Sequence, residues 1–278
     1  MAQFPAEVRI SVPGARIVDG ACRIVVRLRT GDDVEEILQR CGDRLAWIEI
    51  GQDDLNDVAM LESLHGQRLR IYTDSAFPIE PGPTARVLRN TRPVFAVKPL
   101  AGLLRTVNVL ASIRFRVHID ASGSEVDAEA LRKVTDFFLY NPVLASPIEP
   151  LATLLAHVAR RAGHTLWETE LERTNDAYLD EQDRVTAGRR WADDGQFYGS
   201  LEEGWQALAA SPLAERLRGK RRILLRERNA CTVCRHLDLC RGYLKAVDPD
   251  AECTPWQGCF AQLKAAAHRA RGIEDGVS

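Results

Sequence analysis

Several features that often identify a protein's activity are absent from this sequence. No apolar run reaches the length of about 18 residues that a membrane-spanning helix needs. The N-terminal residues have neither a cationic leader nor an apolar stretch, so we expect no secretory signal. A net charge of -2 over 278 residues provides no field to hold a nucleic-acid backbone. We therefore expect a cytoplasmic protein with no membrane and no nucleic-acid partner, in which thiols stay reduced.

Common catalytic motifs are also missing. The sequence contains no Walker loop, no G-x-G-x-x-G, no H-E-x-x-H and no G-x-S-x-G. It has no internal repeat and no low-complexity tract. These motifs therefore give no support to a nucleotide-binding, metalloprotease or serine-hydrolase activity.

Cysteine is scarce until the C-terminal part of the chain, where five of the seven cysteines lie together. They are Cys231, Cys234, Cys240, Cys253 and Cys259, in the pattern C-x2-C-x5-C-x12-C-x5-C. The two-residue gap of the first pair lets both thiolates reach one metal from a tight turn. In a non-secreted chain this spacing predicts a metal or iron–sulfur site, with disulfides or unrelated thiols as the alternatives.

The first half of the chain alternates β-rich runs with helical patterns. Apolar runs predict strands at residues 22–30, 45–51, 68–74, 93–100 and 115–120. Helical patterns separate or follow them at residues 32–45, 55–66, 101–113 and 126–142. Repeated βα units predict an α/β fold with a parallel sheet and helical crossovers, here a partial (β/α) barrel.

A boundary is expected near residues 142–150, where three prolines interrupt the helical pattern. We therefore divide the chain into a barrel of residues 1–150 and a C-terminal part of residues 151–278. That part is expected to begin with a helix over 151–163. A hairpin over 165–185, turning at 174–176, is expected next. Ser200, with Glu203 three residues later, predicts a capping box.

The order of these C-terminal features resembles a known family. The segment G-S-L-E-E-G-W at 199–205, followed by C-x2-C-x5-C-R-G at 231–242, is similar to the SPASM/twitch region of radical S-adenosylmethionine (SAM) enzymes. The specific resemblance covers roughly residues 176–260. It implies a small cysteine-rich SPASM/twitch-like domain that follows a partial barrel and holds an auxiliary iron–sulfur cluster.

The resemblance also implies a ligand set. Cys231, Cys234 and Cys240 match three ligands of one [4Fe–4S] cluster, and a later cysteine, Cys259 or Cys253, supplies the fourth. A four-thiolate zinc site is the alternative, because zinc and iron–sulfur clusters both use thiolate ligands.

We expect the fourth ligand to be Cys259 rather than Cys253. Residues 256–258 end in glycine and are expected to form a flexible turn that brings Cys259 to the centre. The acidic residues of 248–252 disfavour a thiolate at Cys253. His236 lies between two of the cysteines, and we expect it to be an exposed loop residue rather than a ligand.

The sequence departs from the family at the reaction centre. Radical SAM enzymes carry C-x3-C-x2-C after the first barrel strand, and its three thiolates hold the catalytic cluster. Here Cys22 and Cys41 are the only cysteines in the first 230 residues, and both are expected to be core thiols.

The resemblance therefore implies a pseudo-radical-SAM auxiliary subunit that forms a heteromer with a catalytic partner protein. The pathway that it implies is maturation of a ribosomally made peptide substrate. Two alternatives stay open. One is an enzyme that acts at the barrel mouth without SAM radical chemistry, and the other is a zinc-stabilised binding module.

Charged residues at predicted strand ends are the remaining candidates for a site. They are Glu49, Asp74, Lys98, His118 and Asp120. Active sites of βα barrels gather at the carboxyl ends of the strands, so these side chains could line one pocket. The alternative is that they are ordinary solvated strand ends. A basic run at residues 218–228 could contact an acidic partner or offset the charge of a cluster.

Overall fold

The computed structural model describes residues 8–14, 16, 18, 22–73, 83–122, 125–142, 144, 146–160, 163–172, 176–187, 191–192, 194–216, 219, 230–248 and 250–271. The chain forms two compact units, each assembled from segments that are distant in sequence. Unit 1 comprises Met1–Tyr72, Glu80–Val94 and Thr174–Lys220, and unit 2 comprises Thr73–Ile79, Phe95–Arg173 and Arg221–Ser278. The sequence division at residue 150 stays a prediction.

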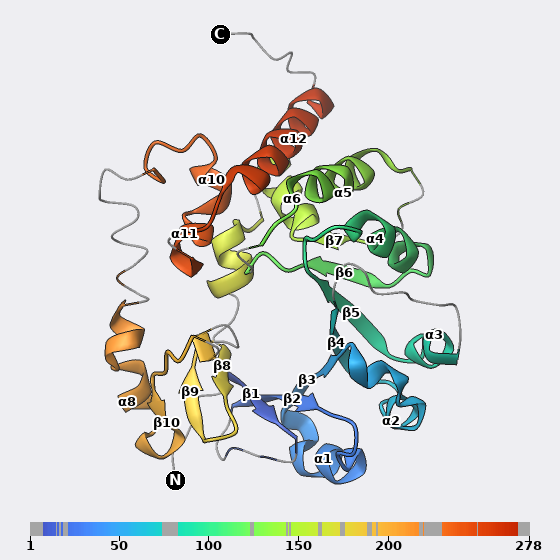
Figure 1. Cartoon of the computed structure of the whole chain (residues 1–278), viewed down its shortest axis with the longest axis vertical. Coiled ribbons are helices and arrows are strands. Elements are labelled where there is room, and N and C mark those ends of the chain that lie inside the picture. Colours follow the sequence, from blue (N-terminus) through green and yellow to red (C-terminus); the bar gives the residue numbers. More distant parts are fainter. Residues whose placement is uncertain are drawn as a thin grey trace. The chain divides into compact units, whose positions relative to one another are not determined.

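Unit 1 has α/β architecture with a mostly parallel sheet, as the alternating sequence pattern predicts (Figure 1). Its strands are β1 (Arg9–Pro13), β2 (Arg23–Leu28), β3 (Leu45–Gly51), β4 (Arg68–Thr73), the first half of β5 (Arg92–Val97), β8 (Asp176–Leu179), β9 (Arg184–Thr186) and β10 (Gly199–Ser200). Their order is β10-β9-β8-β1-β2-β3-β4-β5. β8, β1, β2, β3 and β4 pair in parallel, whereas β9 pairs antiparallel with β8 and β10.

Most helices of unit 1 lie between consecutive strands along the chain. They are α1 (Val34–Cys41), α2 (Val58–Ser63), α3 (Pro83–Leu88) and α8 (Trp205–Ala209), with short 3-10 turns η1 (Gly42–Arg44), η2 (Asp53–Asn56) and η4 (Leu201–Glu203). Asp33 caps α1 by accepting a hydrogen bond from the Glu36 backbone N–H, which satisfies one of the unpaired donors of the first turn. The predicted capping box is confirmed, because the Glu203 carboxylate accepts from the Ser200 backbone N–H at 2.7 Å at the start of η4.

The sheet of unit 1 has two unlike faces because side chains alternate along each strand. On one face, β1 to β4 contribute aliphatic side chains that are at most 2% exposed: Ile10, Val12, Ile24, Val26, Leu28, Ile48, Ile50, Leu69 and Ile71. On the other face, residues of β3 are half-buried at every second position. The first face forms the core of the unit, and the second is polar.

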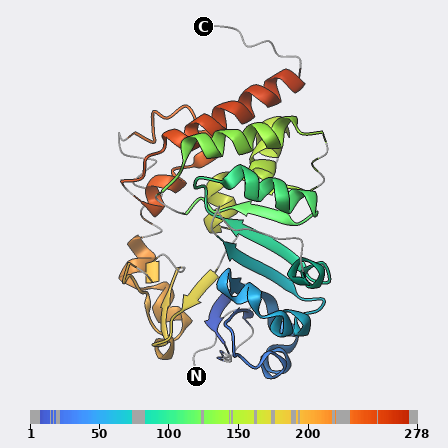
Figure 2. The same ribbon diagram turned by 45° about the vertical axis from the view of Figure 1, so that its right-hand side comes forward.

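Unit 2 has the second half of β5, followed by β6 (Arg116–Ile119) and β7 (Ile148–Glu149), in the order β5-β6-β7 (Figure 2). β6 and β7 are parallel. The helices are α4 (Leu103–Ser112), α5 (Ala128–Tyr140), α6 (Leu151–Arg160), a short π-helix η3 (Glu168–Glu172), α10 (Leu237–Cys240), α11 (Tyr243–Val247) and α12 (Thr254–Ala270). α12 packs against α5 and α6, and α4 packs against α5.

The core of this helical layer is formed by one face of α12. Trp256, Phe260 and Leu263 lie three to four residues apart and are at most 1% exposed. Leu131 and Val134 of α5 are fully buried. The segment after Cys231 contacts this layer, because Lys264 of α12 donates hydrogen bonds to the Arg235 carbonyl and the Asp238 carboxylate.

Two expectations about local structure are wrong. The segment expected as the first strand of a hairpin forms η3 at 168–172, and the hairpin is formed by β8 and β9, which turn at residues 180–183. Residues 256–258, expected as a flexible turn, lie inside α12. A proline at residue 255 is compatible with the first turn of a helix, where its missing N–H has no intrahelical partner.

Candidate functional site

Four of the five clustered cysteines lie close together in unit 2. Cys231 and Cys234 occupy turns before α10, Cys240 ends α10, and Cys253 immediately precedes α12. Burial is the largest cause of the raised pKa values of Cys231, Cys240 and Cys253. Charge repulsion within the group adds to it. Cys234 acts on Cys231, Cys253 and Cys231 act on Cys240, and Cys231 and Cys234 act on Cys253. The fold therefore brings these four thiols into one neighbourhood, the cysteine group.

The backbone after Cys240 is shaped around its sulfur. Arg241 and Gly242 both take left-handed conformations, with φ of 54° and 81°, and glycine adopts this region without steric cost. Burial raises the pKa of Cys240 to about 11, whereas hydrogen bonds from the Leu244 and Gly242 backbone N–H groups lower it. Two fixed donors thus point at a sulfur that would carry negative charge as a ligand.

Helix α12 and a nearby cation support the rest of the cysteine group. Gln257 Nε2 lies 3.9 Å from Cys234 Sγ and donates to it. The positive charge of Lys245 lowers the pKa values of Cys231 and Cys253, against the effect of burial. Lys245 and the backbone donors therefore offset part of the effect of burial, although the pKa values of Cys231, Cys240 and Cys253 stay above that of a free thiol.

The donor set matches a four-coordinate thiolate centre in ligand type. Within the part of the chain that the structure describes, no group of three or more His, Cys, Asp or Glu side chains is already arranged to hold a metal.

Cys259 is placed differently, and the expected role of residues 256–258 as its flexible approach is wrong. Cys259 lies within α12, is 1% exposed and hydrogen-bonds to Thr135 of α5. Among the described residues, the four other thiols of the cluster contribute nothing to its pKa. The helical register of α12 turns Cys259 towards the core with Phe260, which leaves Cys253 as the fourth thiol of the group.

The burial of Cys259 predicts how stability depends on pH. Burial raises the pKa of the thiol from 9.0 to about 12. The unfolded chain therefore loses this proton at lower pH than the folded chain does. We expect the contribution of Cys259 to be complete below about pH 9 and to fall towards about pH 12, by up to about 1.4 kcal/mol per pH unit. The stability advantage of the metal-free wild type over Cys259→Ala should therefore shrink in this range. Parallel pH profiles for the two proteins would contradict the assignment.

His236 is buried, not exposed as expected. The residue is only 3% exposed. The centroid of its ring lies 5.9 Å from that of Phe260. Arg235 Nε donates to His236 Nε2 at 3.0 Å, and His236 Nδ1 has no hydrogen-bond partner among the described residues. Burial lowers its pKa, and the charges of Lys264 and Arg235 lower it further. His236 is therefore neutral, and from its place between Cys234 and Cys240 it packs against α12.

The two early cysteines are core thiols, as expected. Cys22 is fully buried before β2, and Cys41 is 2% exposed at the end of α1. Burial raises the pKa values of both thiols. Neither thiol is available to an exposed cluster.

The charged residues expected at strand ends belong to separate networks. Lys98 is exposed, and Asp120 accepts from the Ser122 hydroxyl at 2.6 Å. His118 Nε2 lies 3.3 Å from Glu170 Oε2, with side chains only 16% and 10% exposed. Asp74 and the basic run at 218–228, apart from residue 219, lie outside the described residues. Glu49 belongs to unit 1.

Glu49 is the centre of a polar face that the sequence reasoning missed. Its carboxylate accepts hydrogen bonds from Trp47 Nε1 at 3.3 Å, the Tyr72 hydroxyl at 3.1 Å and the Ser11 hydroxyl at 3.2 Å. Arg70 Nη1 lies 4.0 Å from the same carboxylate. These residues come from β1, β3 and β4, so the network joins three strands on one face of the sheet.

Guanidinium groups and aromatic rings extend this face. Arg9 and Arg70 lie 4.5 Å and 5.2 Å from the Trp47 ring centroid, and Arg27 lies 3.6 Å from that of Tyr178. Parallel strands covered on both faces carry mostly aliphatic side chains. The polar alternation in β3 and β4 was the available signal that this face is different.

Comparisons with known proteins identify no relative, so any assignment of function depends on the residues described above. The chain matches no protein-family model, no curated protein and no solved structure. Among the described residues, no helix combines the length and apolarity needed to cross a membrane.

Proposed function

We propose that this protein is an iron–sulfur-binding auxiliary subunit whose centre is held by Cys231, Cys234, Cys240 and Cys253. The observation that carries the proposal is the electrostatic proximity of the four thiols within unit 2. A [4Fe–4S] cluster takes four thiolates and supplies one-electron chemistry when bound. Zinc, which also binds four thiolates, is the alternative occupant.

The protein's own residues have defined roles in this proposal. Gly242 and Leu244 direct their N–H groups at Cys240 and stabilise its thiolate. Lys245 offsets negative charge near Cys231 and Cys253. Since raised pKa values keep these thiols protonated without metal, binding releases protons, and we expect the affinity for metal to increase with pH.

We infer an auxiliary role because the first 230 residues lack the three cysteines that a catalytic cluster needs. Radical SAM chemistry needs three thiolates around an open cluster, and the first 230 residues offer only Cys22 and Cys41. Both of these are buried. We therefore propose that a separate catalytic protein acts with this chain in maturing a ribosomally made peptide in the cytoplasm. The SPASM/twitch assignment of the C-terminal part belongs to this proposal.

An anaerobic assay tests the function. Protein reconstituted with iron and sulfide should absorb broadly in the visible range and yet form no 5′-deoxyadenosine from SAM with a strong reductant. A colourless protein that retains zinc would favour the zinc-stabilised module instead. Repeated SAM turnover by the chain alone would contradict the auxiliary role. The Cys22→Ser variant is the matched control, because loss of a buried core thiol should leave the absorption unchanged.

A second candidate is an enzyme that acts without SAM radicals. The observation that favours it is the half-buried pair of His118 on β6 and Glu170 on η3, 3.3 Å apart. A carboxylate beside imidazole can orient the ring and stabilise its protonated form, as in general acid–base catalysis. Turnover of a peptide substrate by the chain alone, lost in His118→Gln with the metal content unchanged, would support this candidate over the first.

A further inference from the structure

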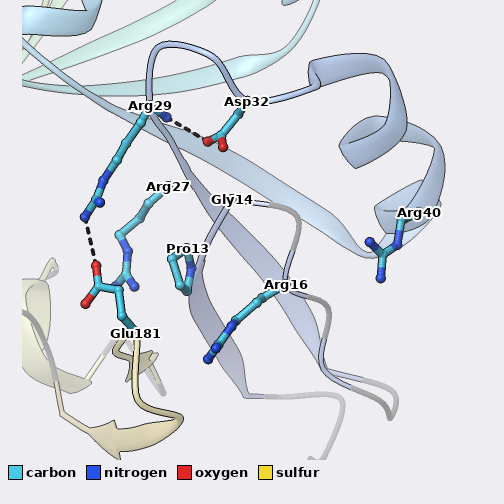
Figure 3. Close-up of a pocket in the computed structure, with 8 residues that line it drawn as sticks. All are labelled: Pro13, Gly14, Arg16, Arg27, Arg29, Asp32, Arg40 and Glu181. Carbon is cyan, nitrogen blue, oxygen red and sulfur yellow. Dashed lines mark hydrogen bonds and ion pairs between the residues drawn. The ribbon is translucent and has the colours of Figure 1, made fainter.

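A cleft opens where the strand order of unit 1 changes direction. β1 has β2 on one side and β8 on the other, all three parallel, so the segments that follow their carboxyl ends diverge. In open α/β sheets, ligands bind at such switch points, outside the carboxyl ends of the strands. The cleft measures about 620 Å³ and includes Pro13 and Gly14 at the end of β1 (Figure 3).

Arginines dominate the lining of this cleft. Arg27 and Arg29 come from the end of β2, Arg16 follows β1, and Arg40 lies on α1. Figure 3 shows these side chains around the opening with only two carboxylates among the lining residues, Asp32 and Glu181. The lining therefore favours a negatively charged ligand.

Asp32 shapes the wall of the cleft. Its carboxylate accepts from the Arg29 backbone N–H at 2.9 Å and thereby closes the turn after β2. Gly14 has φ of 48°, and a Cβ at this position would lie 3.1 Å from Asp32 Oδ1. Glycine therefore lets the two loops approach each other, and Asp32 remains part of the scaffold.

The remaining acidic groups come from the turn between β8 and β9. Glu181 Oε1 lies 2.8 Å from Arg29 Nη2, with the side chains 51% and 75% exposed, and Asp183 pairs with Arg16. Exposed ion pairs contribute at most about 1 kcal/mol, so a ligand can displace them readily. The turn thus supplies carboxylates at positions where an incoming oxyanion would bind.

Arg27 forms the inner wall. Its guanidinium lies 3.6 Å from the Tyr178 ring centroid and donates to the Leu179 backbone carbonyl. A hydrogen bond to Ser11, at 3.5 Å, orients it further. The planar donor group is therefore held in place before a ligand arrives, which reduces the entropy that binding must overcome.

We propose that this cleft binds the oxyanion of a small molecule, a phosphate or a carboxylate, through Arg16 and Arg29 against the wall of Arg27. Guanidinium groups match both oxyanions through paired N–H···O bonds. The Glu181 carboxylate competes with the ligand for Arg29. The proposal is independent of the cysteine group, and the experiment below separates the two.

Calorimetric titration of the full-length protein with inorganic phosphate, pyrophosphate and malonate tests the proposal. Saturable binding is expected at low ionic strength. Tighter binding of phosphate or pyrophosphate than of malonate would indicate that the natural ligand carries a phosphate group, and the reverse order would indicate a carboxylate. Arg29→Ala should weaken binding by at least about tenfold, because it removes a hydrogen bond between charged groups. Glu181→Gln should strengthen binding severalfold, a gain that a purely structural ion pair would not give.

Two controls complete the test. Arg105→Ala removes an exposed arginine from α4 of unit 2 and should leave the affinity unchanged. Cys240→Ser should also leave oxyanion binding unchanged, whatever it does to metal. Absence of saturable binding by all three probes would overturn the proposal. So would equal affinities in wild type, Arg29→Ala and Glu181→Gln, each shown to be folded by circular dichroism.

Discussion

Replacing any one of Cys231, Cys234, Cys240 and Cys253 by serine is expected to remove the bound metal. A hydroxyl is a poor substitute for a thiolate on iron or zinc, and outer contacts alone already change metal affinity 10- to 100-fold. We therefore expect at least about 100-fold weaker binding after loss of a ligand. Metal content per chain, measured after anaerobic reconstitution and desalting, gives the result. Cys240→Ser should have the largest effect, since its sulfur also accepts two backbone hydrogen bonds.

Cys259→Ala is the matched control for this series. Its thiol is buried in α12 against Thr135, so the variant should keep its metal while losing some stability. The opposite pattern, with metal lost in Cys259→Ala and kept in Cys253→Ser, would return the fourth position to Cys259. Full metal content in all four serine variants would show that the cysteine group does not hold the metal.

The second large effect is expected at Phe260. Its ring is 1% exposed, lies 6.1 Å from that of Trp256 in α12, and contacts the His236 ring at 5.9 Å. Phe260→Ala should lower the free energy of unfolding of the metal-free protein by about 3–5 kcal/mol, because the truncation leaves a cavity. Denaturant unfolding gives the measurement.

A surface aromatic residue supplies the comparison. Tyr140, at the end of α5, is 59% exposed, and Tyr140→Ala should change the unfolding free energy by only about 0.5 kcal/mol. If Phe260→Ala cost no more than this, the packing of the cysteine segment on α12 would not be a source of stability. Weakened metal binding in Phe260→Ala, without loss of a ligand, would show that the same packing holds the cysteine group in place.

Regular elements with strong periodicity could be predicted well from the sequence. The strand expected at 45–51 is β3 over those same residues, because apolar and polar side chains alternate throughout it. The helix expected at 126–142 is α5 over 128–140, with its polar cap at Asp127. The strand β1, only five residues long, was missed.

The start of α12 could not be predicted from residue types alone. Pro255 and Gly258 favour turns in isolation, yet Pro255 fits the first helical turn and Gly258 lies on an exposed side of the helix. Once this register is known, Cys259 falls on the same face as Trp256 and Leu263. The fourth ligand that we propose therefore depends on where one helix begins.

The two polar features of unit 1 needed the sheet order as well. The residues around Glu49 come from three strands, and the cleft combines arginines from the β1, β2 and α1 segments with Glu181, which follows β8. Each strand by itself shows only alternation. The parallel pairing of β1 to β4 assembles the Glu49 network. The pairing of β1 with β8, between residues more than 150 positions apart, brings Glu181 to the arginines.

X-ray absorption spectroscopy of the metal-loaded wild-type protein tests the central claim most directly. We predict a first shell of four sulfur atoms per metal at about 2.3 Å, made of four thiolates on zinc or of one thiolate and three sulfides on each iron of a [4Fe–4S] cluster. The Cys259→Ala variant should give the same spectrum. A first shell that contains nitrogen or oxygen ligands, or a protein that retains no metal under anaerobic conditions, would contradict the assignment of Cys231, Cys234, Cys240 and Cys253 to one centre.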